Sequence, residues 1–161
     1  MDALPPPTPV TAQCIVEAAI RQSLPVEIVV AVLKVEGGSP GLKKKNENGT
    51  FDLGPAQINT IHLGKGFPEG WLRNHGCYNT HVAAYILRGE IDKVGGNFWR
   101  GVGNYHSRTP HLHQAYLRRI ANAVRETSEY SARMRQIFLD QAPAGSGAHE
   151  APSLALNDLP K

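Results

Sequence analysis

The chain has 161 residues, and its 17 Lys and Arg against 14 Asp and Glu give a formal net charge of +3 at pH 7. This length, with 41% hydrophobic residues, is that of one compact domain, and the charge excess is too small to indicate a nucleic acid or any other particular partner. No apolar run is long enough to cross a membrane, and residues 1–10 lack the basic and apolar regions of a signal peptide, so we expect no membrane span and export, if any, by another route or with a leader missing from this chain.

The first half of the chain predicts two helices after an extended segment. Residues 1–10 contain three consecutive prolines and are typical of an extended lead-in. A helix is expected to begin near Thr11, a good N-cap residue, and to end at about Ser23. Pro25 then opens a second helix, which is almost entirely apolar over 26–36 and is stopped by two glycines. A helix that is apolar all round is a buried helix.

A polar stretch and two further helices are expected next. Residues 37–54 are rich in Gly, Lys and Asn and predict either a loop or a short β-hairpin. A short helix is expected around 56–63, followed by a connector that contains glycine and tryptophan. The apolar spacing over 78–88 predicts a clear helix.

The last third predicts a short helix, a long helix and a tail. The short helix covers 98–105, and the long one covers 112–124 and continues towards Leu139. Residues 141–161 are rich in Ala, Gly, Pro and Ser and predict a flexible C-terminal tail. Together the elements predict a mainly α domain over 11–140 between the lead-in and the tail.

The two cysteines, Cys14 and Cys77, allow a single intramolecular pairing. A disulfide between them would imply an oxidising compartment and would stabilise the fold by about 4 kcal/mol on the chain-entropy model. Two buried thiols in a cytosolic protein fit the same spacing equally well, so the residues alone leave both alternatives open.

Glu36 is a candidate general acid on physical grounds. On a helical projection it lies opposite Glu27 and Lys34, on the most apolar face of the second helix. It also ends that helix, where unpaired carbonyl groups disfavour negative charge, so burial and the helix dipole both raise its pKa. A carboxylic acid that is protonated near neutral pH is what general acid catalysis requires. A last-turn glutamate that bends into solvent is the alternative, which the residues alone slightly favour.

Four segments then change the interpretation: VLKVEGG at 32–38, NGTFDLGPAQIN at 48–59, CYNTHVAAYIL at 77–87 and FWRGVGNYHSRTPHLHQAYLRRI at 98–120. In order and spacing they resemble the motifs of the soluble lytic transglycosylase (SLT) family, and specifically its small members associated with type IV secretion, conjugation and type III secretion. The resemblance covers about 14–124. It implies a lysozyme-like helical domain of the goose-lysozyme and SLT type, with a short loop or a small β-hairpin.

The resemblance implies Glu36 as the catalytic acid and a groove that binds the substrate. The substrate-binding residues it implies are Gly54, Gln57, Asn59, Tyr105 and His106. Gly54 would open a helix that carries Gln57, and its lack of a side chain would suit a close approach to sugar. On their own, Gln57 fits a surface amide, Asn59 a helix end and Tyr105 a core aromatic residue, and the order of the motifs favours the functional interpretation.

The chain departs from the family pattern at two positions. Gly37 stands where the family usually has Ser after the catalytic Glu, and Ala56 stands where it usually has Met before the Gln. His106 replaces the Asn of many relatives, a variant associated with the secretion and conjugation branch. In that branch the resemblance also implies the Cys14–Cys77 disulfide, and with it a periplasmic location.

The mechanism implied by the resemblance needs only one carboxylic acid. Glu36 would protonate the bond between N-acetylmuramic acid (MurNAc) and N-acetylglucosamine (GlcNAc), and the sugar's own 6-hydroxyl would then close a 1,6-anhydro ring. Attack by water would instead make the protein a lysozyme. Asp52 is the best second carboxylate, although an aspartate that caps a local turn is the more common arrangement.

Other classes of function fit less well. The seven histidines match no standard metal site, and no phosphate-binding loop is present, so we expect no metal and no cofactor. A helical DNA-binding protein is disfavoured because the arginines of the late helices are spread around them rather than gathered in a stripe. A peptidoglycan-binding module with little or no catalysis, which would recruit a secretion or conjugation apparatus, remains the alternative from another class. We expect a monomer.

Overall fold

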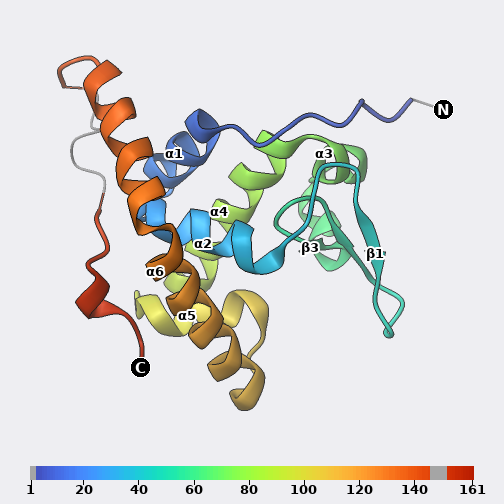
Figure 1. Cartoon of the computed structure of the whole chain (residues 1–161). Helices are drawn as coiled ribbons and strands as arrows, with labels where there is room; N and C mark the ends of the chain where they lie inside the picture. Colours follow the sequence, from blue (N-terminus) through green and yellow to red (C-terminus); the bar gives the residue numbers. More distant parts are fainter. Residues whose placement is uncertain (1–2, 146–151) are drawn as a thin grey trace.

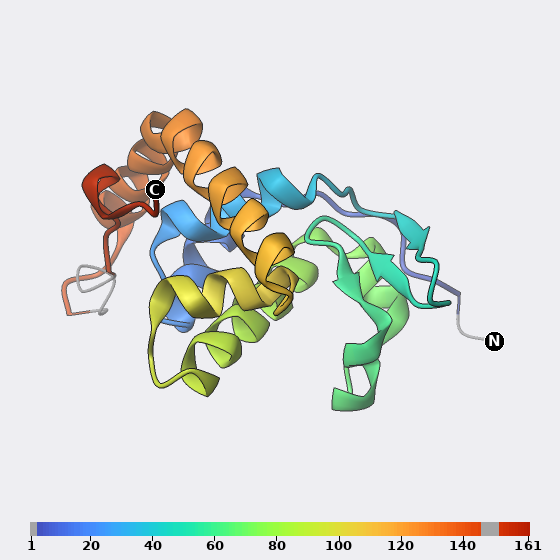
Figure 2. The same cartoon turned by 90° about the horizontal axis from the view of Figure 1, so that it is seen from below.

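The computed structural model describes residues 3–145 and 152–161. Its elements in chain order are α1 Ala12–Arg21, α2 Val26–Glu36, β1 Lys43–Lys45, β2 Phe51–Leu53, β3 Ile58–Asn59, the 3-10 helix η1 Thr60–Lys65, α3 Glu69–Asn74, α4 Gly76–Lys93, α5 Phe98–His106, α6 Pro110–Gln141 and the 3-10 helix η3 Leu156–Asp158. Helices α1, α2, α5 and α6 gather on one side, the sheet and α3 lie on the other, and α4 runs between them (Figures 1 and 2). The chain therefore has the mainly helical, lysozyme-like fold that the sequence predicts, with a small β-hairpin.

The first two helices begin and end as predicted. The Thr11 side chain accepts a hydrogen bond from the Cys14 backbone N–H at 3.2 Å and so caps α1. Pro25 precedes α2, and Gly37 ends it in a left-handed conformation, with φ of 64°. Helix α2 is buried along most of its length and packs chiefly against α6.

The polar stretch forms a hairpin, which is one of the two predicted alternatives. Strands β1, β2 and β3 form an antiparallel sheet in that order, with Lys44 opposite Asp52 and Asp52 opposite Asn59. The helix predicted around 56–63 is wrong for 56–59, and from Thr60 the chain forms the 3-10 helix η1. Gln57 has φ of 49°, which a helix does not allow, and the residues after it pair with β2 before η1 begins.

Other element boundaries differ from the predicted ones. The connector predicted before the fourth helix contains α3, and α4 extends beyond the predicted 78–88 at both ends. Helices α5 and α6 cover their predicted ranges, and α6 continues to Gln141.

The described part of the C-terminal segment packs against the helices. The part of the predicted tail at 146–151 lies outside the described residues, whereas 152–161 lies against the helices. Leu159 is buried, and the indole N–H of Trp99 donates to the Asp158 carbonyl oxygen at 2.9 Å. Apolar side chains at Leu154 and Leu159 supply the contact that a composition rich in Ala, Gly and Pro did not indicate.

The core has two parts that meet at the cleft described below. The larger part lies among the helices α1, α2, α4, α5 and α6, and the smaller lies under the sheet, between β2, β3, α3 and α4. Leu33 and Tyr105 pack against both parts. A disulfide joins Cys14 of α1 to Cys77 of α4, with Cα atoms 5.5 Å apart. Within the described ranges, no helix combines the length and the apolar character needed to cross a membrane.

Candidate active site

A polar cleft of about 270 Å³ lies where the helices meet the sheet. Its lining residues are Glu36, Asp52, Gln57, Ile58, Asn59, Ile61, His62, Ile86, Tyr105 and His106. The structure thus brings together every residue predicted for the site except Gly54. They come from the end of α2, from β2, β3 and the turn between these strands, and from the end of α5.

Glu36 is a carboxyl group of the cleft whose pKa is strongly raised. Burial raises the pKa of its carboxyl from the usual 4.5 to about 7, and the negative charge of Asp52 adds to the rise. The Tyr116 hydroxyl and the positive charges of Arg119 and Lys44 act in the opposite direction, but they do not outweigh burial. Near neutral pH a large fraction of Glu36 therefore carries its proton, and the carboxyl can act both as a proton donor and, once ionised, as a proton acceptor.

Two tyrosines surround this carboxyl. The Tyr105 hydroxyl donates to the Ala56 carbonyl oxygen at 3.2 Å, which ties α5 to the turn before β3. The Tyr116 hydroxyl is buried beside Glu36, where it lowers the pKa of the carboxyl. No described group is placed for a well-formed hydrogen bond to this hydroxyl. Burial, reinforced by the nearby charge of Glu36, raises the pKa of both hydroxyls well above the usual range, so both stay protonated.

His106 lies flat against Tyr116. The two rings are 4.7 Å apart between centroids and only 6° from parallel, and the Arg119 guanidinium lies 5.5 Å from the centroid of the Tyr116 ring. Burial lowers the pKa of His106, and Arg119 lowers it further, so the imidazole is neutral near pH 7. It can therefore donate one hydrogen bond and accept another in the cleft.

Gly38 lets the end of α2 approach the sheet closely. A Cβ atom at this position would collide with the carbonyl oxygen of Gly54 and with the side-chain amide of Gln57, and the Gly38 N–H donates to the Pro55 carbonyl oxygen at 3.1 Å. The second glycine after Glu36 thus does more than end a helix, because it allows the acid to reach the cleft. Gly37, where the family usually has Ser, adopts a left-handed backbone that favours glycine.

Gly54 has a structural role that differs from the predicted one. It ends β2 with φ of 66° instead of opening a helix, and a Cβ atom there would collide with the Leu72 carbonyl oxygen and with the Asn79 side chain. Its carbonyl oxygen accepts a hydrogen bond from the Gln57 side chain at 2.8 Å. Gly54 therefore serves close packing of the backbone and orients Gln57, and it does not line the cleft.

Asn79 is a supporting residue that the sequence analysis missed. It is fully buried in α4, accepts from the Ala56 N–H at 2.8 Å, and donates to the carbonyl oxygens of Leu53 and Leu72. These bonds hold the turn that carries Gln57. The sequence contains a signal for a buried polar residue, since Asn79 lies one turn before the apolar stripe of α4 and on the same side of the helix.

Asp52 and Asn59 form a pair across the sheet. The Asn59 amide donates to the Asp52 carboxylate at 2.8 Å and to the Thr50 hydroxyl at 3.0 Å, and its carbonyl oxygen accepts from the Ile61 N–H. Asp52 therefore lies on a strand beside the acid, and the expectation of a turn-capping aspartate is wrong. The side-chain oxygen of Asn59 caps η1, and its amide nitrogen donates hydrogen bonds to Asp52 and Thr50.

His62 is a polar residue of the cleft that sequence reasoning missed. It lies in η1, and burial lowers its pKa. Within the described part of the chain, no group of three or more His, Cys, Asp or Glu side chains is placed to hold a metal ion.

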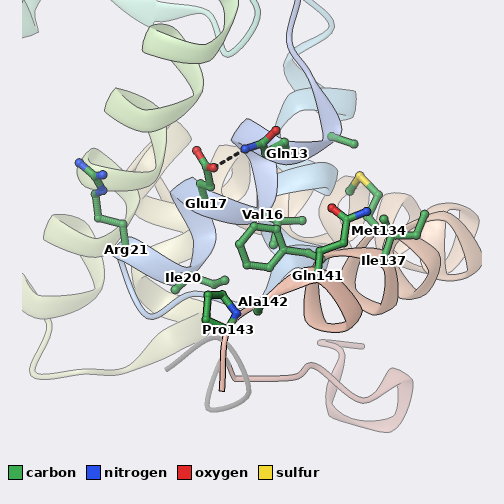
Figure 3. A pocket seen from close by; sticks show the side chains of 12 residues that line it. Gln13, Val16, Glu17, Ile20, Arg21, Met134, Ile137, Gln141, Ala142 and Pro143 are labelled. Atoms are coloured by element: carbon green, nitrogen blue, oxygen red, sulfur yellow. Dashed lines mark hydrogen bonds between the residues drawn. The ribbon is translucent and has the colours of Figure 1, made fainter. Parts of the chain in front are cut away.

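A larger hollow of about 600 Å³ lies between α1 and the end of α6 (Figure 3). Most of its lining is apolar, and its carboxylate, Glu17, accepts a hydrogen bond from Gln13 at 2.8 Å. None of its lining residues belongs to the Glu36 cleft, and no buried acid lies in it. Size alone therefore does not identify the candidate active site, whereas the chemistry of the smaller cleft does.

Fold and site together define a lysozyme-like helical domain in which the half-buried, proton-bearing carboxyl group of Glu36 lies at the junction of helices and sheet. The chain is similar to Invasion protein IagB of Salmonella typhi, with 29% identity over 130 residues, or 75% of this chain and 81% of the relative. It is also similar to Invasion protein IagB of Salmonella typhimurium strain SL1344, with 31% identity over 103 residues, 61% of this chain and 64% of the relative. No protein-family model matches the chain.

Proposed function

We propose that the protein is a peptidoglycan lytic transglycosylase that cleaves the β-1,4 bond between MurNAc and GlcNAc and leaves a 1,6-anhydroMurNAc end. The single observation that carries this proposal is Glu36, a half-buried carboxyl with a pKa of about 7 in a cleft lined mainly by polar side chains. The lysozyme-like fold and the ordered motifs around the cleft support it.

The reaction needs two proton transfers, and one group with such a pKa can make both. In the first step Glu36 donates its proton to the glycosidic oxygen, the bond from that oxygen to C1 of MurNAc breaks, and the GlcNAc side leaves with a free 4-hydroxyl. The carbonyl oxygen of the MurNAc N-acetyl group stabilises the positive charge at C1. In the second step the Glu36 carboxylate takes the proton of the 6-hydroxyl while O6 bonds to C1, which restores the acid and consumes no water.

The surroundings of Glu36 suit both steps. Tyr116 lies beside the carboxyl and Tyr105 is fixed to Ala56, so two protonated hydroxyls stand near the charge that forms when Glu36 ionises. We assign Gln57, Asn59 and His106 to the cleft wall that binds sugar, with Asn59 acting through its bond to Asp52.

Hydrolysis by a lysozyme mechanism is the second candidate, and Asp52 is the observation that favours it. This carboxylate lines the same cleft, and its charge contributes to the raised pKa of Glu36, so it is placed to orient a water molecule. The two reactions differ in their products, which makes them separable by experiment.

The proposal includes the cellular compartment in which the protein acts and the apparatus that it serves. The disulfide is typical of an oxidising compartment, which supports a periplasmic location, and a monomeric enzyme would act there on glycan strands. The relatives are named invasion proteins, and we propose that this chain opens the wall locally for a secretion or conjugation apparatus. A binding module that recruits such an apparatus is the alternative if turnover is absent.

The test is digestion of purified peptidoglycan by the wild type, by Glu36→Gln and by Glu47→Gln, with mass spectrometry of the released muropeptides. Glu47 is an exposed carboxylate of the β1–β2 turn and provides the matched control. Anhydro-ended products from the wild type and the control, but not from Glu36→Gln, are the expected result. Reducing-end products would establish a lysozyme, and no products at all would contradict an enzymatic function.

A further inference from the structure

We propose that Lys44 is a specificity residue that binds a carboxylate of the substrate, supplied either by the lactyl group of a bare muramyl sugar or by its stem peptide. This inference rests on the proposed function and assigns the charged part of the substrate to one wall of the cleft. The placement of Lys44 on the sheet carries it.

Lys44 belongs to a polar row that crosses the sheet. It lies opposite Asp52 in the β1–β2 pair, and Asp52 lies opposite Asn59 in the β2–β3 pair. Directly opposed residues of an antiparallel sheet project from the same face. Because Asp52 and Asn59 line the cleft, Lys44 projects from that face too and stands at its outer edge, on the edge strand β1.

The neighbouring lysines face the other way. Lys43 is bonded to Glu69, and its ammonium lies 4.4 Å from the centroid of the Phe51 ring. Lys45 shares that second face, since side chains alternate along a strand. Of three consecutive lysines, only the middle one is directed to the cleft.

The Lys44 charge is available to a ligand. Its side chain is exposed, and no carboxylate of the described ranges forms an ion pair with it, Asp52 included. The positive charge of Lys44 nevertheless acts on Glu36 in the cleft, because it lowers the pKa of the Glu36 carboxyl. A cation that is free of partners and close to two acids is suited to binding an anion that those acids would otherwise repel.

The substrate carries its anionic groups in a defined place. The glycan backbone is neutral apart from the lactyl group of each MurNAc, which bears a carboxylate when bare and a stem peptide with its own carboxylates when substituted. The Asp52 carboxylate, and Glu36 when it is ionised, disfavour such groups near the cleft, and Lys44 offsets this repulsion at the edge. An exposed pair of this kind contributes about two- to five-fold to affinity.

The experiment measures binding in the Glu36→Gln background, where cleavage does not interfere. Three ligands are compared: glycan strands with stem peptides, strands from which an amidase has removed them, and uncharged chitin oligosaccharides. We expect Lys44→Gln to weaken binding about two- to five-fold for one or both of the charged ligands and to leave chitin binding unchanged. Loss on the peptide-bearing strands alone assigns the stem carboxylates, and loss on the bare strands alone assigns the lactyl carboxylate.

Lys45→Gln is the control, since it removes the same charge from the opposite face and should change none of the three affinities. Equal losses on charged and uncharged ligands, equal effects of the two substitutions, or no effect of Lys44→Gln would overturn the assignment. Failure of the proposed function would appear elsewhere, as absence of cleavage by the protein that retains Glu36, and would not alter the comparison of affinities.

Discussion

Glu36→Gln should stabilise the protein at alkaline pH while it removes catalysis. A carboxyl whose pKa is raised on folding binds its proton more tightly in the folded state, so folding stability falls as the pH rises through the interval between the two values. For Glu36 this interval runs from the usual 4.5 to about 7. Each tenfold change in the dissociation constant corresponds to about 1.4 kcal/mol, so the full loss is about 3 kcal/mol.

The predicted change in stability has a defined sign and is confined to the pH range between the two pKa values of Glu36. Below about pH 4.5 the acid is protonated in both states and contributes no difference, whereas above about pH 7 the folded protein holds a buried charge at full cost. A glutamine has the shape of the protonated acid and carries no charge. The stability of Glu36→Gln relative to the wild type should therefore increase from pH 4.5 to 7 and then stay constant.

Urea unfolding of both proteins at pH values from 4 to 9, with the disulfide intact, measures this difference directly. Glu47→Gln is the control, and as an exposed substitution it should stay within about 0.5 kcal/mol of the wild type throughout. A difference between wild type and Glu36→Gln that does not vary with pH would refute the conclusion that Glu36 is buried with a raised pKa.

Four further results are expected. For the wild type, kcat/KM should fall above about pH 7 as Glu36 loses its proton, and a profile flat to pH 9 would argue against this acid. Asp52→Asn should move that fall to lower pH, because the Asp52 charge helps to raise the pKa of Glu36, and an upward movement would contradict the electrostatics. Reduction of the Cys14–Cys77 disulfide should cost about 4 kcal/mol of unfolding free energy, measured by urea titration with and without reductant. Arg135 of α6 forms an ion pair with Glu27 of α2, with 2.9 Å between a guanidinium nitrogen and a carboxylate oxygen. Arg135→Gln should cost about 2 kcal/mol in the same assay because it leaves the half-buried Glu27 carboxylate without its cation, and an unchanged midpoint would show that the pair is solvated.

Much of the helical part of the fold could be predicted from the sequence because its signals are local. A capping threonine, a proline before α2 and a glycine after it act within one turn, and the structure has all three in place. The apolar stripe of α4 likewise depends on spacing alone.

The sheet and the turn before η1 could not be predicted in the same way. The backbone conformation of Gln57 is fixed by bonds from Asn79, which lies 22 residues later in the chain, to the turn around it. The packing of 152–161 depends on Trp99 and Arg135, which lie 59 and 17 residues from the Asp158 and Pro152 carbonyl groups that they contact. Such contacts are determined by tertiary structure, and no short window of sequence contains them.

In the candidate site, too, some residues could be identified from local sequence signals and others only from the tertiary structure. The position of Glu36 at the end of an apolar helix could be interpreted from periodicity, and the resemblance supplied most of the other residues. Tyr116 was not identified as a site residue from the sequence, because its distance from Glu36 along the chain hides their proximity. In the sequence Lys44 is only one of three consecutive lysines, and the register of the hairpin is needed to show that it lies on the same face of the sheet as Asp52.

The two parts of the core share side chains at the cleft, and this has a mechanical consequence. Leu33 and Tyr105 pack against both parts, and the Tyr105 hydroxyl is bonded across the junction to Ala56. The walls of the cleft cannot swing apart as separate bodies without exposing Leu33 and breaking that bond. A glycan strand would thus enter a preformed groove, and amide protons on the two walls should exchange with solvent in one cooperative opening.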